Sequence, residues 1–138
     1  MIQNGIEKII NSGDLMIITN VKVAKPDKSM TIIVRALWDT GATFTAVNYA
    51  VANQLSLPKT IEIPAQSVFD KTTTQLYSGI VCIEEVPIIK HYNFFLGSYP
   101  YSEEHNYDMV IGMDIIRLGN FCLSPINNGE QQLFRFFN

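Results

Sequence analysis

Apolar residues recur along the chain at the spacing of β-strands, in stretches separated by turn-forming residues. Residues 15–24 and 30–38 are rich in Ile, Val and Thr, and they flank the turn sequence Lys25-Pro-Asp-Lys-Ser29. This arrangement predicts a β-hairpin. A second hairpin is predicted over 64–86, with strands at 65–69 and 75–86 and a polar tip at 70–74.

Further strands are predicted at residues 88–96, 107–111, 121–124 and 132–137. The last two flank Asn127-Asn-Gly129, which favours a tight turn. Residues 1–14 are expected to form a polar, weakly structured lead-in, and residues 15–138 to form a single domain.

Helical periodicity is confined to two short stretches. Val47, Val51 and Leu55 lie at positions i, i+4 and i+8, with Thr45 as the expected N-cap and Pro58 as the stop. A second helix is expected over 113–118, ended by Gly119. The chain is therefore expected to be mainly β with two short helices, which favours a small closed or half-closed barrel.

Composition narrows the class of protein. The chain has 138 residues, of which 47% are hydrophobic and 17% charged, with a formal net charge of −3. These values exclude a disordered tail, a collagen-like repeat and a coiled coil. No basic run indicates nucleic-acid binding. The low charge suggests that part of the surface is buried against a partner.

No targeting or membrane segment is recognised. The first ten residues lack a basic region followed by an apolar one, and no apolar run approaches the roughly 18 residues of a membrane span. We therefore expect a cytoplasmic protein that does not contact a membrane. Cys82 and Cys122 lack metal-binding or redox spacing and are expected to be buried free thiols.

The segment with the strongest chemical signal is Ala36-Leu-Trp-Asp-Thr-Gly-Ala-Thr43, in which an apolar strand leads into Asp39. A carboxylate at the end of a buried strand needs hydrogen-bond partners. Gly41 lets the backbone turn and leaves its N–H accessible. Two interpretations stay open from these residues alone: a positioned functional carboxylate, or an aspartate that starts a turn and caps a helix.

A second segment, Asp108-Met-Val-Ile-Gly-Met-Asp114, follows about seventy residues later. With both segments in this order, the chain resembles the retropepsins, the retroviral and retroviral-like aspartic proteases. The resemblance covers about residues 15–137. It implies a small closed β-barrel with a flap hairpin and two short helices, assembled as a homodimer. The terminal strand 132–137 would interleave with its partner's ends.

The resemblance also implies roles for individual residues. Asp39 would be the catalytic acid/base, and Thr40 would reach across the twofold axis to the partner's loop. Gly41 would donate backbone hydrogen bonds to the carboxylates, with Ala42 as a further support. Gly112 would allow the chain to pass close beneath the loop. The flap would close over an extended peptide, and its expected residues are Phe69, Asp70, Lys71, Thr72 and Thr73.

Aspartic peptidases use two carboxylates that share one proton and hold a water between them. This chain has one Asp-Thr-Gly sequence, and its other aspartates lack the Thr-Gly that follows Asp39. The second carboxylate is therefore expected from a second copy related by twofold symmetry. An acidic-to-neutral pH optimum is expected, because one carboxylate must be protonated and the other ionised.

Several residues depart from the family pattern. Trp38 replaces a smaller aliphatic residue, while Thr43 and Met113 replace the two members of an ion pair. The tip around 70–74 lacks glycine. The glycine-free tip and Trp38 motivate an alternative function, a catalytically inactive retropepsin-like module for dimerisation or peptide binding. A third interpretation is an unrelated small β-barrel that binds an apolar ligand as a monomer.

Other chemistries have weaker signals. His91 and His105 have no tight ligand spacing with the acids or cysteines, so neither a metal nor another cofactor is expected. No serine lies in a Gly-x-Ser-x-Gly context, which disfavours a serine hydrolase.

Overall fold

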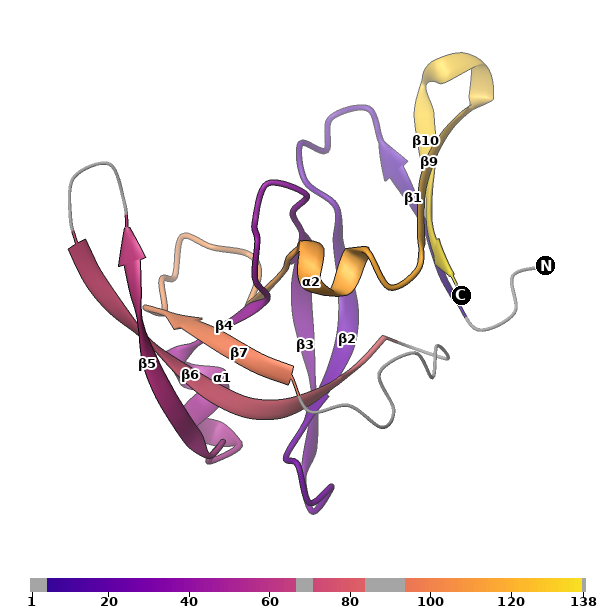
Figure 1. Cartoon of the computed structure of the whole chain (residues 1–138). Coiled ribbons are helices and arrows are strands. Elements are labelled where there is room, and N and C mark those ends of the chain that lie inside the picture. The colour runs from indigo at the N-terminus through magenta and orange to yellow at the C-terminus, as the bar shows by residue number, and fades with distance from the viewer. Residues whose placement is uncertain (1–4, 67–70, 84–93, 138) are drawn as a thin grey trace.

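The computed structural model describes residues 5–66, 71–83 and 94–137 of the chain (Figure 1). They form a mainly β structure with two short α-helices, as predicted. The strands are β1 Gly5–Asn11, β2 Ile18–Ala24, β3 Thr31–Trp38, β4 Ala46–Asn48, β5 Lys59–Gln66, β6 Lys71–Cys82, β7 Phe94–Tyr99, β8 Met109–Ile111, β9 Asn120–Ile126 and β10 Gln131–Phe137. The helices are α1 Tyr49–Gln54 and α2 Met113–Ile116, with a 3-10 turn at Asn127–Gly129.

Seven strands form the main sheet, in the order β2-β3-β8-β4-β7-β6-β5. A further antiparallel pairing of β2 with β6, from Lys22 opposite Cys82 to Ala24 opposite Ile80, joins six of these strands in a ring. This second pairing spans only three residue pairs. We therefore describe a ring of strands, and the closed barrel stays a prediction.

The first predicted hairpin is confirmed as β2 and β3. The Lys25 N–H donates to the Met30 carbonyl at 3.0 Å, and Lys28 adopts a φ of 63° in the turn. The first strand begins at Ile18 rather than at Leu15, which is 96% exposed.

The second hairpin is shifted relative to the prediction. β5 begins at Lys59, and its last residue, Gln66, pairs with Lys71 of β6, while residues 67–70 lie outside the described residues. Residues 71–74, predicted as part of the tip, instead belong to β6. The last residues of the predicted strand 75–86 and the first of 88–96 lie outside the described residues. The remaining part of the latter is β7.

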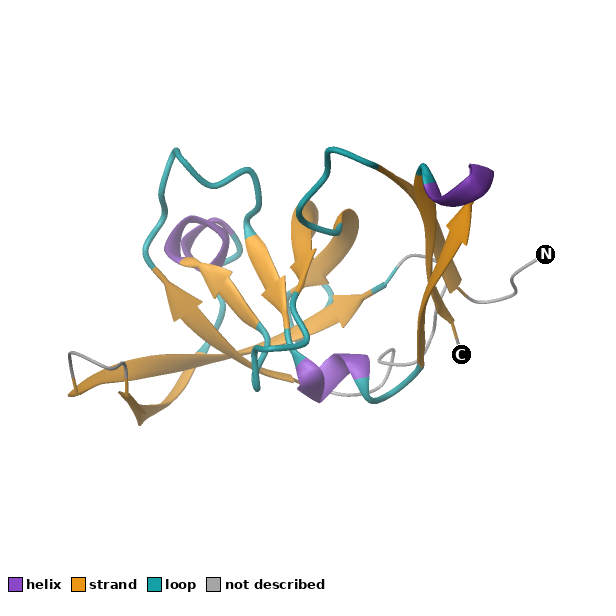
Figure 2. Cartoon of the chain, turned by 90° about the horizontal axis from the view of Figure 1, so that it is seen from above, coloured by secondary structure: helices purple, strands orange, loops and turns teal. Residues whose placement is uncertain are grey.

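A separate three-stranded sheet has the order β1-β10-β9 and stands at one side of the main sheet (Figure 2). The prediction of a weakly structured lead-in was wrong for residues 5–11, because β1 pairs with β10 from Gly5 opposite Phe137 to Asn11 opposite Gln131. Both edges of β10 are paired within its own chain, which contradicts the expected interleaving with a partner. The domain boundary at residue 15 stays a prediction.

Trp38, the last residue of β3, joins the two sheets. Its ring centroid lies 5.1 Å from that of Phe134 and 4.8 Å from that of Phe136, both of which are fully buried. The indole Nε1–H donates to Thr19 Oγ1 at 2.9 Å, so the polar atom of this buried ring is satisfied. The terminal sheet therefore packs directly on the residue that precedes Asp39.

The helices also differ from the prediction in detail. Val47 lies in β4, and the N-cap of α1 is Asn48, whose side chain accepts from the Val51 N–H at 2.9 Å. Thr45, the predicted N-cap, instead donates its hydroxyl hydrogen to Asp114. α2 ends at Ile116, earlier than predicted.

Cys82 and Cys122 are free thiols, half-buried rather than buried. Within the described ranges, no helix is long and apolar enough to cross a membrane.

Candidate active site

Asp39 leaves the sheet at the end of β3, beside the parallel strand β8. Trp38 pairs with Ile111, and the next N–H, that of Asp39, donates to the Ile111 carbonyl at 2.9 Å. The chain then turns, because the Ala42 N–H donates to the Asp39 carbonyl at 3.1 Å. The start of the loop is therefore fixed by backbone bonds on both sides of Asp39.

The half-buried Asp39 carboxylate is oriented by its own loop. The Gly41 N–H donates to Asp39 Oδ1 at 2.8 Å, an arrangement typical of aspartates in tight turns. A Cβ at Gly41 would lie 3.2 Å from that oxygen, so glycine keeps the contact free of crowding. Thr40 and Gly41 are exposed, which leaves the carboxylate at a surface that another molecule can reach.

Gly112 lies where the chain between β8 and α2 passes under this loop. A Cβ at position 112 would come within 2.7 Å of the Phe44 carbonyl carbon and 2.8 Å of the Ala42 oxygen. Real Cβ atoms do not approach backbone this closely, so only glycine fits. The close passage expected of Gly112 is therefore present.

Two backbone bonds flank this crossing. The Met113 N–H donates to the Ala42 carbonyl at 2.8 Å, and the Asp114 N–H donates to the Thr43 carbonyl at 3.2 Å. The side chains of Thr43 and Met113 carry no charge and cannot form an ion pair across this crossing. Main-chain hydrogen bonds hold the two segments together there.

Thr45 and Asp114 complete the site, and sequence reasoning missed both. Thr45 is fully buried, and its Oγ1 donates to Asp114 Oδ1 at 2.7 Å. The Thr45 N–H donates to Asp114 Oδ2 at 3.0 Å. The sequence did offer a signal for Asp114, which lies two residues after Gly112, and Gly112 directly follows an apolar strand segment.

The other described aspartates already have partners. Asp108 accepts from the Arg35 guanidinium at 3.2 and 3.3 Å, and this hydrogen bonding raises the pKa of Arg35. Hydrogen bonds from Ser29 hold the pKa of Asp27 below its usual value, in the turn between β2 and β3. Asp14 accepts from the Asn11 N–H at 3.0 Å. Each of these three carboxylates therefore has a hydrogen-bond donor of its own.

The expected flap residues are only partly described. Phe69 and Asp70 lie outside the described residues. Lys71, Thr72 and Thr73 lie in β6, opposite Gln66, Ala65 and Pro64 of β5. The hairpin that carries them forms the β5 edge of the main sheet (Figure 1).

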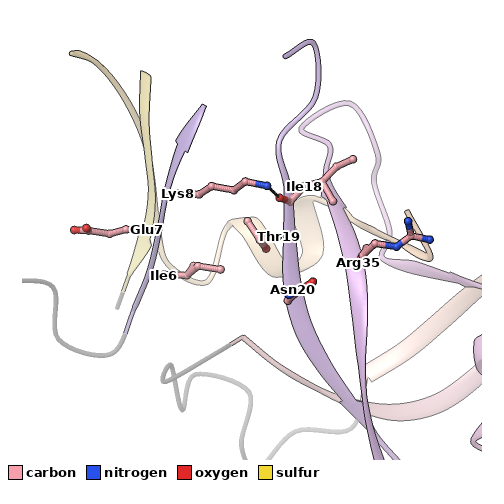
Figure 3. Close-up of a pocket in the computed structure, with 7 residues that line it drawn as sticks. All are labelled: Ile6, Glu7, Lys8, Ile18, Thr19, Asn20 and Arg35. Carbon is pink, nitrogen blue, oxygen red and sulfur yellow. Dashed lines mark hydrogen bonds between the residues drawn. The ribbon is translucent and has the colours of Figure 1, made fainter. Parts of the chain in front are cut away.

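A cleft with a volume of about 380 Å³ lies between β1 and β2, and Asp39 does not line it (Figure 3). Lys8 crosses this cleft from β1, and its ammonium group donates to the Ile18 carbonyl on β2. The lining residues are Ile6, Glu7, Lys8, Ile18, Thr19, Asn20 and Arg35. Among the described residues, no group of three or more His, Cys, Asp or Glu is arranged to hold a metal ion.

Comparison with known proteins identifies the fold. No protein-family model and no curated protein matches the chain by sequence. The structure is similar to that of a retropepsin-like aspartic protease from Rickettsia conorii, with a TM-score of 0.58 and 15% identity, over 96% of this chain and 92% of that one. The retroviral protease-like domain of Ddi1 from Leishmania major has a TM-score of 0.46 and 14% identity, over 85% of this chain and 93% of that one.

The chain therefore has a retropepsin-like fold, as its sequence motifs predicted. This result disagrees with the interpretation as an unrelated small β-barrel.

The crossing at Gly112 leads to a stability prediction. Gly112→Ala should lower the free energy of unfolding by about 1–3 kcal/mol, because the added methyl group overlaps the backbone of Ala42 and Phe44. Gly13→Ala is the matched control, since nothing lies within 4 Å of a Cβ there, and it should stay within about 0.5 kcal/mol of wild type. Urea unfolding measures the free energy of unfolding of both variants. Equal losses of stability would contradict the close approach of the backbone at Gly112.

Proposed function

We propose that the chain is one protomer of a homodimeric aspartic endopeptidase, with Asp39 of each protomer supplying one of the two catalytic carboxylates. The observation that supports this most is a half-buried carboxylate held by the Gly41 N–H on an exposed loop of a retropepsin-like fold. The engagement of Asp14, Asp27, Asp108 and Asp114 elsewhere also favours a second copy as the source of the second carboxylate.

The proposed chemistry follows from two carboxylates held close together. They cannot both ionise easily, so they share one proton. The ionised member accepts a proton from a bound water, which attacks the carbonyl carbon of the scissile peptide bond. The protonated member donates a hydrogen bond to the carbonyl oxygen. Under this proposal Thr40 contacts the partner's loop, and an extended peptide binds as an added strand under the hairpin of β5 and β6.

The distribution of exposed apolar residues also favours a partner at this end of the molecule. Residues 12–17 lead into the start of β2, and residues 39–45 follow the end of β3. These two strand ends are adjacent, because the Trp38 N–H donates to the Ile17 carbonyl at 2.9 Å (Figure 1). Leu15 is 96% exposed and Phe44 is 59% exposed on these two segments. A partner bound at this end would cover large apolar side chains that are otherwise exposed to water.

The first test removes the proposed acid/base. Asp39→Asn should lower peptide cleavage by at least about 10²–10⁴-fold, because an amide cannot accept the proton from water. Fold and dimer mass should not change, since asparagine has the same shape and can still accept from Gly41. Cleavage of a peptide library across pH, together with sedimentation, measures both. Asp27→Asn, in an exposed turn, is the control and should keep full activity.

Retained cleavage by Asp39→Asn would refute the mechanism. Peptide binding by the wild-type protein without cleavage products would instead favour the catalytically inactive module.

The second test asks whether one site needs two chains. When wild-type protein is mixed with Asp39→Asn at constant total concentration, the remaining activity should be proportional to the square of the wild-type fraction. An equimolar mixture, after subunit exchange, should keep about one quarter of the activity, because only dimers with two intact carboxylates turn over. A linear dependence, with half of the activity retained, would show that each chain is catalytically complete.

A further inference from the structure

We infer that Thr45 and Asp114 are positioning residues that fix the far end of the Asp39 loop, an inference that rests on the proposed function. The near end of this loop is held by the bond between the Asp39 N–H and the Ile111 carbonyl. Thr45 is the residue at which the loop reaches β4. Its contacts therefore decide how the seven residues from 39 to 45 are held at their second end.

The Thr45 hydroxyl uses its donor and an acceptor position at once. It donates to Asp114 Oδ1 at 2.7 Å and accepts from the Gly112 N–H at 3.1 Å. Thr45 is fully buried, so this hydroxyl does not reach a substrate. Gly112 is the residue over which the loop crosses, so the hydroxyl connects the end of the loop to the crossing itself.

The Asp114 carboxylate binds the backbone of Thr45 as well as its hydroxyl. Oδ2 accepts from the Thr45 N–H at 3.0 Å, and Oδ1 also accepts from the Ile115 N–H at 2.9 Å. One carboxylate thus ties the loop end to the first turn of α2. Both ends of the Asp39 loop are consequently attached to the same short segment, residues 111–114.

This attachment matters for a carboxylate that must meet its counterpart on a twofold axis. A displacement of the loop by about 1 Å is enough to lower turnover roughly 10²-fold in a preorganised site. The backbone of Thr45 has an independent anchor, because its carbonyl accepts from the Gly97 N–H at 3.0 Å. Removing the hydroxyl should therefore loosen the loop without detaching this part of the chain from β7.

The test compares Thr45→Val with Thr45→Ser in the full-length protein. Valine matches the shape of threonine but lacks the hydroxyl, whereas serine retains it. Thr45→Val should lower kcat by about 10–100-fold with KM within about threefold of wild type, measured per folded molecule. Thr45→Ser should restore kcat to within about threefold of wild type. Asp114→Asn, which offers one acceptor oxygen instead of two, should have an intermediate kcat.

Amide hydrogen exchange of the peptide spanning 39–45 provides a measurement that does not require activity. Exchange at Gly41 and Ala42 should be faster in Thr45→Val than in Thr45→Ser under conditions where both are folded. Unchanged exchange and unchanged kcat in Thr45→Val would overturn the inference, as would a loss of activity that only follows the unfolded fraction. An inactive wild-type protein would refute the proposed function, while the exchange experiment would still decide the role of Thr45.

Discussion

The structure depends on one steric constraint, the crossing of two chain segments at Gly112. The backbone of Ala42 and Phe44 passes so close that a Cβ at position 112 would lie 2.7–2.8 Å from it. Because no side chain separates the segments, main-chain hydrogen bonds form on both sides of the crossing, at Ile111 and at Met113. The Asp39 loop is thereby held against a buried strand instead of extending freely into solvent.

Trp38 extends this constraint to the rest of the molecule. Its ring packs on Phe134 and Phe136 of β10, so the terminal sheet lies against the residue just before Asp39. The large side chain in place of a smaller aliphatic residue is matched by these phenylalanines and by the hydroxyl of Thr19. Packing thus explains how the fold accommodates a large side chain at this position.

Local sequence patterns predicted much of the fold and the catalytic candidate. Turn residues such as Pro26 and Gly129 mark hairpins, and Asp39-Thr-Gly41 marks the loop. The errors concern contacts between distant residues. β1 mixes three isoleucines with polar residues in no strict alternation, and it becomes a strand by pairing with β10 at the other end of the chain. Thr45 looked like a helix cap because its partner, Asp114, lies 69 residues away.

The central claim is that two copies of Asp39 form one site. The most direct test is a crystal structure of the protein with a statine-type inhibitor, whose hydroxyl occupies the place of the attacking water. The account predicts a twofold dimer in which this hydroxyl lies within hydrogen-bonding distance, about 2.5–3.0 Å, of an Asp39 oxygen from each protomer. A monomer, or a dimer in which the two Asp39 loops point away from each other, would contradict it.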